Sequence, residues 1–392
     1  MRRLRNTRPP HVALIVETSK HYGREIILGI SRYLKVHGPW SIFTTERGQD
    51  DADPAWLHEW TGDGIITRSR DLRGCRAARD RGIPVVSLRH LLDRPDFPTL
   101  MPDQDLIGCR VATHLLERGL RHFAYVGVPG AKAWDRVRRL AFVRTLEEKC
   151  VGDIVVRPVL ADPNLDWEGE EEQIAAWVRR LPPSVGIMVA HDTQGLRILD
   201  ACRRAGRSVP DGVAVVSVDN DPVLCEVATP RLSSLDQNLQ RLGFEAARLL
   251  GRMMAGERPP PANHFTEPGE VVLRQSSDTI AVASPGLARA VRLIRERAGV
   301  GVDVPMAAKW AGMSRRGFER TFSAQLRRSP LAEIHDVRLR RVRQLLIETD
   351  LVLPRIAELA GFQSQQYLAR FFKEHTGFSP GVFRRRMRFD AS

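Results

Sequence analysis

The C-terminal part of the chain contains one pattern twice, and this internal repeat restricts the possible folds more than any other feature of the sequence. Two alanines and a glycine at 308, 311 and 312 return at 357, 360 and 361, an offset of 49. Two copies of one small supersecondary unit account for such a repeat. The matching positions that follow, at an offset of 50, are Ser314, Phe318, Arg320 and Phe322 in the first copy and Ser364, Leu368, Arg370 and Phe372 in the second.

Each copy has the parts of a helix-turn-helix. A small alanine allows two helices to cross closely, and Gly312 or Gly361 can take the left-handed conformation that ends the first helix. Ser314 or Ser364 is then placed to cap the second helix. A short helical hairpin with no role in DNA binding would share this local pattern, so the charge of the region is needed to choose between the two.

The net charge of +13 is concentrated in the same region. Residues 285–392 hold 21 Lys and Arg against 10 Asp and Glu, whereas residues 1–284 hold 39 against 37. Positive charge concentrated on a small domain suits a polyanion, because neutralised phosphates release their counterions. We therefore expect double-stranded DNA as a partner. No apolar run approaches the roughly 18–20 residues of a membrane span, and no membrane partner is expected.

The first turns of each second helix are the expected base-reading positions, since a recognition helix presents them to the major groove. Arginine suits guanine, glutamine suits adenine, and glutamate can accept from cytosine. Other arginines, such as Arg341, Arg343 and Arg384, are expected at phosphates or in solvent. The predicted DNA-binding residues are Arg315, Arg316, Glu319 and Arg320 in the first copy and Gln365, Gln366 and Arg370 in the second.

The first 284 residues alternate short β-rich runs with helix-length segments. Strand-like runs at 11–16, 84–88, 123–127, 185–190 and 213–218 are separated by amphipathic stretches. This alternation predicts right-handed crossovers and mainly parallel sheets with helices on both faces. The length of the region suits two such α/β lobes.

Ligands of parallel sheets bind beyond the carboxyl ends of the strands, and polar residues follow several of the predicted strands. Charged groups can fork onto vicinal hydroxyls while an aromatic ring covers the apolar face of a sugar, so the set predicts a small-polyol site. Singly, an Asp or Asn after a strand also serves as a helix cap or turn former. The candidate ligand residues at these ends are Tyr22, Arg24, Trp134, Arg138, Asp192, Asp219, Asn220 and Gln237.

The sequence offers no recognisable catalytic or cofactor-binding motif. We find no glycine-rich nucleotide loop, no nucleophile elbow and no zinc-protease pair, and the five scattered cysteines have neither disulfide nor zinc-site spacing. The apolar stretch after the basic N-terminus is too short for a signal peptide. We therefore expect a cytoplasmic protein that is not an enzyme, with no catalytic residues, no metal and no cofactor.

The N-terminal region resembles the sensor domain of LacI/GalR-type regulators, which has the type I periplasmic-binding-protein-like fold, although the usual N-terminal DNA-binding headpiece is absent. Arg138, opening a helix with Trp134, corresponds to the sugar-gripping arginine of that family. Segments around Asp192, Asn220 and Gln237 correspond to its later ligand-lining stretches. Asp103 stands where the chain first crosses between lobes. The family usually has a small residue followed by Asp-Asn at this place, whereas the sequence here reads Pro-Asp-Gln. The resemblance implies two hinged lobes with crossings near 100, 234 and 261.

The C-terminal region resembles the AraC/XylS family over roughly residues 287–388. The segments that carry this resemblance are 356–362, 367–373 and 377–380. Members of that family dock both helix-turn-helix units in adjacent major-groove segments on one face of DNA. The first unit is less regular here, because Arg316 occupies a place where relatives often carry an aromatic residue.

The domain order implied by these resemblances is a basic tail at 1–10, a LacI-like sensor at 11–278, a linker at 279–286 and an AraC-type double helix-turn-helix domain at 287–388. A LacI-like sensor ahead of an AraC-type domain resembles the regulators of pentose operons. That resemblance implies a transcription activator controlled by D-xylose or a related pentose, acting at a DNA operator, as a homodimer, with RNA polymerase as a possible contact. When bound to DNA it would be associated with the nucleoid.

Three alternatives remain open from the sequence. The chain could be a sugar-modifying enzyme fused to a DNA-binding domain, or a regulator of another mono- or disaccharide. It could also be a constitutive DNA-binding protein with a vestigial sensor. Sugar binding without chemical change is what separates the expected regulator from the first and third of these.

Overall fold

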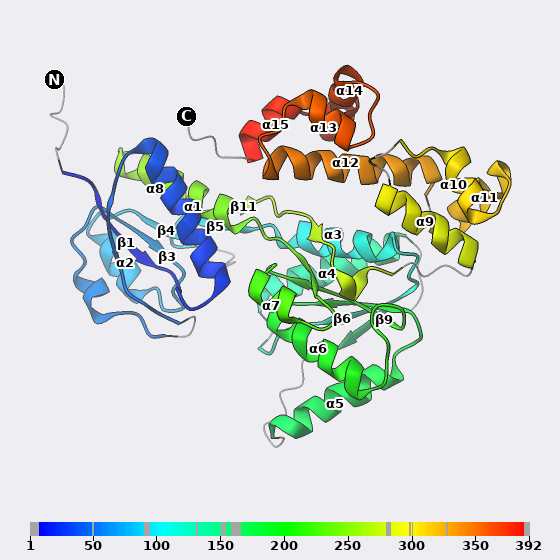
Figure 1. Ribbon diagram of the computed structural model, residues 1–392. Helices are drawn as coiled ribbons and strands as arrows, with labels where there is room; N and C mark the ends of the chain where they lie inside the picture. Colours follow the sequence, from blue (N-terminus) through cyan, green and yellow to red (C-terminus); the bar gives the residue numbers. More distant parts are fainter. Residues whose placement is uncertain are drawn as a thin grey trace. The chain divides into compact units, whose positions relative to one another are not determined.

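The computed structural model describes residues 8–48, 51–89, 95–130, 132–149, 154–157, 166–279, 284–297, 299, 301–326 and 328–387. Two compact units are present, one of residues 1–113 and 122–277 and the other of residues 114–121 and 278–392. Figure 1 shows the α/β elements of the first unit and the helices of the second. Most of the expected basic tail, residues 280–283 of the expected linker and position 388 lie outside the described residues.

The first lobe of unit 1 is a parallel sheet with strand order β11-β5-β4-β3-β1-β2 among the described residues. Buried aliphatic runs form its central strands, as expected for a sheet covered on both faces. Its strands are β1 (His11–Ile15), β2 (Ser41–Thr44), β3 (Gly64–Thr67), β4 (Val85–Ser87), β5 (Thr99–Pro102) and β11 (Asn263–Thr266).

Two helices pack on each other over one face of this sheet. They are α1 (His21–His37) and α8 (Leu239–Met254), and their apolar sides share a core with β1 and β3. A Cβ on Gly29 would lie 1.9 Å from the Gln240 carbonyl oxygen, so this close crossing requires glycine. A second core on the opposite face includes α2 (Arg73–Asp80) and the 3-10 turn η1 (Ala55–Glu59).

The second lobe has the strand order β12-β10-β9-β8-β6-β7 among the described residues. Its pairings are parallel except that of β10 with β12, which is antiparallel. Its strands are β6 (His122–Val126), β7 (Ile154–Arg157), β8 (Val185–Val189), β9 (Val213–Val218), β10 (Ser233–Leu235) and β12 (Val271–Val272). The helices that follow or precede them are α3 (Gln104–Leu116), α4 (Ala133–Glu148), α5 (Trp167–Arg180), α6 (Asp192–Arg204) and α7 (Pro222–Val227).

The chain passes between the two sheets three times within the described residues. It leaves the first sheet after β5, returns after β10 and leaves again between β11 and β12. The first two passages lie close to the expected positions near 100 and 234. The third lies between Thr266 and Val271 rather than near 261, because residues 263–266 still pair with β5. All three therefore join strand ends, where a cleft between lobes is expected.

The second unit is helical throughout its described residues (Figure 1). Proline opens several of its helices at the first turn, where a missing N–H costs nothing. Its helices are α9 (Pro285–Arg297), α10 (Val304–Ala311), α11 (Arg315–Leu326), α12 (Pro330–Glu348), α13 (Leu353–Leu359), α14 (Gln365–Thr376) and α15 (Pro380–Met387).

Two separate apolar cores hold this unit, one for each copy of the repeat. The first gathers α9, α10, α11 and the start of α12 around Phe318 and Phe322, and the second gathers the rest of α12 and α13 to α15 around Leu368 and Phe372. Phenylalanine at i and i+4 places both rings on one face of α11, where their centroids lie 5.4 Å apart. Each copy of the sequence repeat therefore forms an apolar core of its own.

In the described part of the chain, a group of ions centred on a buried carboxylate accompanies the first core. Glu333, fully buried on α12, pairs with Arg328 and with Arg295, whose Nε lies 3.1 Å from the glutamate Oε1. Residues 114–121 belong to the same unit, and Glu117 lies 3.4 Å from Arg328 and 3.5 Å from Arg340. Four arginines and three carboxylates take part, and we call them the ion cluster: Glu117, Arg118, Arg295, Arg328, Glu333, Asp336 and Arg340.

Candidate functional site: a polar cleft and two exposed helices

Side chains from the two lobes face one another beyond the carboxyl ends of the strands. Tyr22 lies in the first turn of α1, after β1, and Asp219 follows β9 in the second lobe. Burial, followed by the negative charge of Asp219, raises the pKa of Tyr22, and the positive charges of Arg138 and Arg89 oppose this shift. Asp219 and Arg138 of the second lobe therefore lie close enough to Tyr22 of the first lobe for their charges to act on its phenol.

Arg138 is the best-fixed of these groups. It is buried on α4, and its Nε and Nη2 donate to Gln104 Oε1 over 3.0 and 2.6 Å while Nη1 donates to the Ala190 carbonyl. Its guanidinium carbon lies 4.8 Å from the centre of the Trp134 ring. Both acceptors are neutral, so among the described residues the charge of Arg138 is oriented without being neutralised by an ion pair of its own.

Asp219 is held in a strained backbone conformation at the same place. Its φ of 117° lies in the region that favours glycine, and such outliers concentrate at functional sites. Gln237 Nε2 donates to its carboxylate over 2.5 Å. Burial, followed by the nearby charge of Asp192, raises the pKa of Asp219, whereas Arg138 lowers it. The result is a carboxyl group that is short of water and close to a guanidinium.

Four other predicted ligand residues are engaged by the protein itself. Asp192 accepts from the hydroxyls of Ser217 and Ser234 and, over 2.7 Å, from the Asp221 backbone N–H. Asp103 caps α3, accepting from the backbone N–H of residues 105 and 106. Arg24 is exposed and donates to the Thr18 carbonyl over 3.0 Å. These contacts position the strand ends and loops around the cleft.

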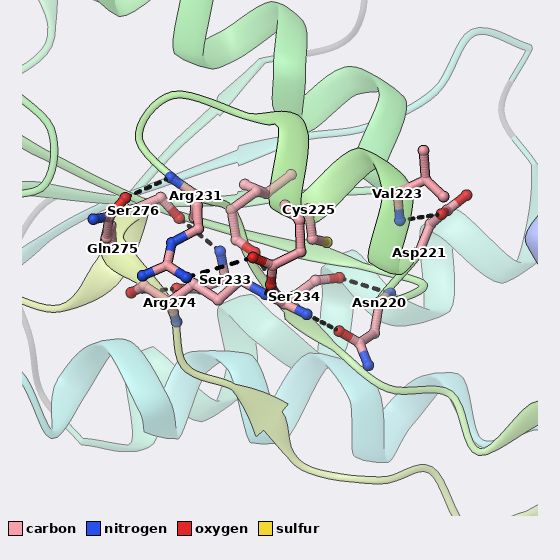
Figure 2. A network of polar contacts seen from close by, with 12 residues as sticks. Asn220, Asp221, Val223, Cys225, Arg231, Ser233, Ser234, Arg274, Gln275 and Ser276 are labelled. Atoms are coloured by element: carbon pink, nitrogen blue, oxygen red, sulfur yellow. Dashed lines mark hydrogen bonds and ion pairs between the residues drawn. The ribbon is translucent and has the colours of Figure 1, made fainter.

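Figure 2 shows how the fourth, Asn220, is tied into the loop after β9. Its side-chain oxygen accepts from Arg274 over 3.0 Å, and its backbone N–H donates to the Ser234 hydroxyl over 2.9 Å. Arg274 also reaches the Leu232 carbonyl and Glu226. The network fixes the backbone next to Asp219, so the strained residue has a rigid neighbour.

Beside the predicted Tyr22, the first lobe brings to the cleft charged residues that sequence reasoning did not include among the ligand residues. Glu17 and Arg68, which follow β1 and β3, form a buried ion pair, and the guanidinium of Arg68 lies 4.1 Å from the centre of the Tyr22 ring. Arg89, after β4, donates to the Arg68 carbonyl over 3.2 Å. The rule that found Asp219 points to each of these residues singly, as a polar residue after a strand, but not to the pairing of Glu17 with Arg68.

Within the described part of the chain there is no cluster of three or more His, Cys, Asp or Glu side chains that could hold a metal ion. The same residues include no helix with the length and apolar character needed to cross a membrane. The described cleft therefore offers hydrogen-bonding groups, a stacked indole and buried charges.

The second helix of each repeat begins as the sequence predicts. Gly312 and Gly361 have φ values of 68° and 73°, in the left-handed region. Ser314 accepts from the Gly317 N–H and Ser364 from the Tyr367 N–H, each over 3.2 Å. Both helix-turn-helix corners are thus confirmed in their conformation and caps, and α11 and α14 are the second helices.

The predicted DNA-binding side chains lie on the outer faces of α11 and α14. Glu319, which is half-buried, is paired with Arg315 over 3.0 Å. Sequence reasoning missed Tyr367, an exposed aromatic of α14 whose ring centre lies 5.6 Å from the Arg370 guanidinium carbon. The exposed members of the predicted set are Arg315, Arg316, Arg320, Gln365, Gln366 and Arg370.

Comparison with protein families divides the chain in the same way. Residues 11–101 match the model described as XylR N-terminal domain, and residues 112–277 match that of the periplasmic binding protein-like domain. Residues 307–386 match a helix-turn-helix domain. The fold expected from the sequence, a two-lobed sensor followed by helix-turn-helix units, is confirmed.

Similar proteins cover nearly the whole chain. The xylose operon regulatory protein of Escherichia coli K12 is 28% identical, over 96% of this chain and 97% of its own, and that of Haemophilus influenzae is 27% identical, over 95% and 97%. A solved structure of the xylose-binding transcription activator xylR has a TM-score of 0.62 and 28% identity, over 96% and 98% of the two chains. A CelR–cellobiose complex, 22% identical with a TM-score of 0.53 over 70% of this chain, shares the fold of the sensor.

These matches define a DNA-binding transcription regulator of the helix-turn-helix class, with an AraC-type C-terminal domain and a LacI-like sensor of the sugar-binding fold. Within that class, the chain is a homologue of the xylose operon regulatory proteins. The matched relatives are transcription regulators.

Proposed function

We propose that the chain is a transcription activator whose effector is D-xylose or a related pentose, bound between the two lobes of the sensor. The observation that carries this proposal is the cleft in which Arg138 is fixed beside Trp134 and the charges of Arg138 and Asp219 act on the pKa of Tyr22. Donors, an acceptor and an indole at one place suit the hydroxyls and the apolar face of a single sugar ring. The relatives named for xylose support the choice of a pentose.

Sugar binding would act on DNA through the balance between an open and a closed sensor. A ligand shifts such a balance only if it binds one state more tightly than the other. A hundredfold preference supplies about 2.7 kcal/mol, enough to make a minority state the majority. We infer that the sugar closes the lobes and favours the form of a homodimer that engages two operator segments in the cytoplasm, with RNA polymerase as a further contact.

The test is a paired measurement on the full-length protein. Calorimetric titration with D-xylose, L-arabinose, D-ribose, D-glucose and cellobiose would identify the effector. Binding to a duplex selected from a random pool would then be measured with and without that sugar. We expect a pentose to bind most tightly and to raise affinity for the selected duplex. Binding of a sugar with no change in DNA affinity or oligomer geometry would contradict the coupling.

The alternative functions give different outcomes in the same experiment. A sugar-modifying enzyme would change the mass of the sugar during incubation, whereas a sensor returns it unaltered. A vestigial sensor would bind none of the sugars while the DNA affinity persisted. Preference for cellobiose would indicate a disaccharide regulator, like the CelR structure that shares the sensor fold.

A further inference from the structure

We propose that the ion pair of Glu17 and Arg68 in the first lobe is a specificity-determining element that recognises two adjacent hydroxyl groups of the sugar. This inference rests on the proposed function and assigns a role to residues outside the set predicted from the sequence. Glu17 would accept from one hydroxyl while Arg68 donates to its neighbour.

The position of the pair is that of a binding group. Glu17 follows β1 and Arg68 follows β3, so both lie beyond the carboxyl ends of central strands of the first sheet. The Arg68 backbone N–H donates to the Ile15 carbonyl over 2.8 Å, which fixes the start of the loop. A Cβ on Gly23 would lie 1.8 Å from the Glu17 carbonyl oxygen, so α1 begins directly against this residue.

The two side chains are held before any ligand arrives. Arg68 is 11% exposed and Glu17 is 3% exposed, and the guanidinium stacks on Tyr22. A preformed, desolvated pair costs a ligand little ordering entropy. The Nε of Arg68 is buried and has no hydrogen-bond partner among the described residues. A buried donor of this kind calls for an acceptor, and a sugar hydroxyl in the cleft is suited to supply one.

The pair also faces the second lobe. Burial, followed by the charge of Arg89, lowers the pKa of Arg68 to about 9, and the charge of Asp219 in the second lobe opposes this shift. Arg68 in turn lowers the pKa of Asp219. A sugar in this cleft would therefore lie between Glu17 and Arg68 on one side and Arg138 and Asp219 on the other.

Such a pair discriminates by the penalty for a missing hydroxyl. A deoxy sugar would leave a buried ion without its partner, which costs about 10- to 100-fold in affinity. Because one member accepts and the other donates, the penalty should fall on two neighbouring carbons of the ring. Positions held by the second lobe would show separate penalties.

The experiment is calorimetry of the full-length protein with D-xylose and its series of monodeoxy analogues. The wild-type protein should show 10- to 100-fold losses at two adjacent positions. In Glu17→Gln and Arg68→Met, and in the double variant, the losses at these positions should shrink to less than threefold, while other positions keep theirs. Arg32→Met, at an exposed arginine of α1, is the matched control and should leave the whole profile unchanged.

Each outcome decides between the explanations. A purely structural role of the pair would weaken all analogues by the same factor, and would overturn the inference. So would a wild-type profile without any adjacent pair of penalties, a result that needs no variant to fold. If the wild-type protein bound no sugar at all, the proposed function would fail and this inference with it. Sugar binding with an unchanged profile in the variants would overturn this inference alone.

Discussion

The two helix-turn-helix units have matching sequences but different supports. Both have a glycine corner, a serine cap and a phenylalanine-rich core. The first adds the ion cluster around Glu333, whereas α15 of the second is tied by Arg384 to the carbonyls of Leu346 and Leu351. In the described part of the second helix-turn-helix unit, no carboxylate is buried as Glu333 is. The repeat therefore specifies the DNA-facing element, and each copy is anchored in its own way.

The largest expected effect is on the ion cluster. Glu333→Ala should destabilise the first helix-turn-helix unit by about 3–5 kcal/mol, because Arg295 and Arg328 would keep buried charges without the carboxylate of Glu333. Hydrogen exchange should show that the backbone amides of α9 and α12 lose protection, whereas the protection of α14 stays unchanged. Glu374→Ala, at an exposed glutamate of α14, is the control and should change stability by less than about 0.5 kcal/mol. Equal losses in both units would remove the distinction between them.

The second effect concerns the two exposed arginines at matching places. Arg370→Ala should weaken binding to a selected duplex by about 1–3 kcal/mol and random-sequence binding far less. Arg320→Ala should cost less, because Tyr367, which lies beside Arg370, is replaced by Gly317 in the first copy and leaves Arg320 without that platform. Competition binding of both variants measures this. Equal losses on selected and random DNA would reassign Arg370 to phosphate contact.

The third effect is a dependence of the stability of the first helix-turn-helix unit on pH. Burial, followed by the charges of Arg118, Arg340 and Arg295, holds the pKa of His114 well below its usual 6.5. The unfolded chain takes up a proton below pH 6.5 and the native unit does not, so the stability is full above 6.5 and falls on acidification. The slope cannot exceed about 1.4 kcal/mol per pH unit.

Hydrogen exchange of α9 at pH 7.5 and 5.5 measures this dependence. His114→Gln should remove most of the difference in the first unit. If the wild-type protection were the same at both values, a neutral, buried His114 would be contradicted.

The smallest effect is on the helix caps. Ser314→Ala and Ser364→Ala should each cost about 1 kcal/mol, since each removes one hydrogen bond to the first turn of a second helix. The two losses should be equal within about 0.5 kcal/mol, which thermal unfolding of the two variants against wild type would check. Unequal losses of stability would mean that the different contacts anchoring each helix-turn-helix unit also affect the stability of its second helix.

The sequence allowed the repeat, the corners and the α/β alternation to be predicted, because these depend on local patterns. Gly312 and Ser314 need only their neighbours to act. The pair of Glu17 and Arg68 was not predicted, since its members are 51 residues apart and meet only through the order of strands in the sheet. In a chain with 60 Lys and Arg, one arginine after a strand carries little information without that order.

The membership of residues 114–121 is a further case of long-range partners. The sequence places them in the middle of the sensor, from the end of α3 to the residue before β6, yet their contacts group them with the helical unit. Only the partners of Glu117, more than 170 residues further along the chain, reveal this. Local patterns in the sequence do not carry such information.

That grouping has a consequence for taking the protein apart. A fragment cut at the linker would carry away Arg295, Arg328 and Arg340 and leave behind Glu117, one of the carboxylates that offset them. Chimeras that exchange DNA-binding modules between relatives at residue 284 would inherit the same mismatch. A transplant should keep the host's 114–121 matched to the incoming helices, so this chain is less modular than its domain order suggests.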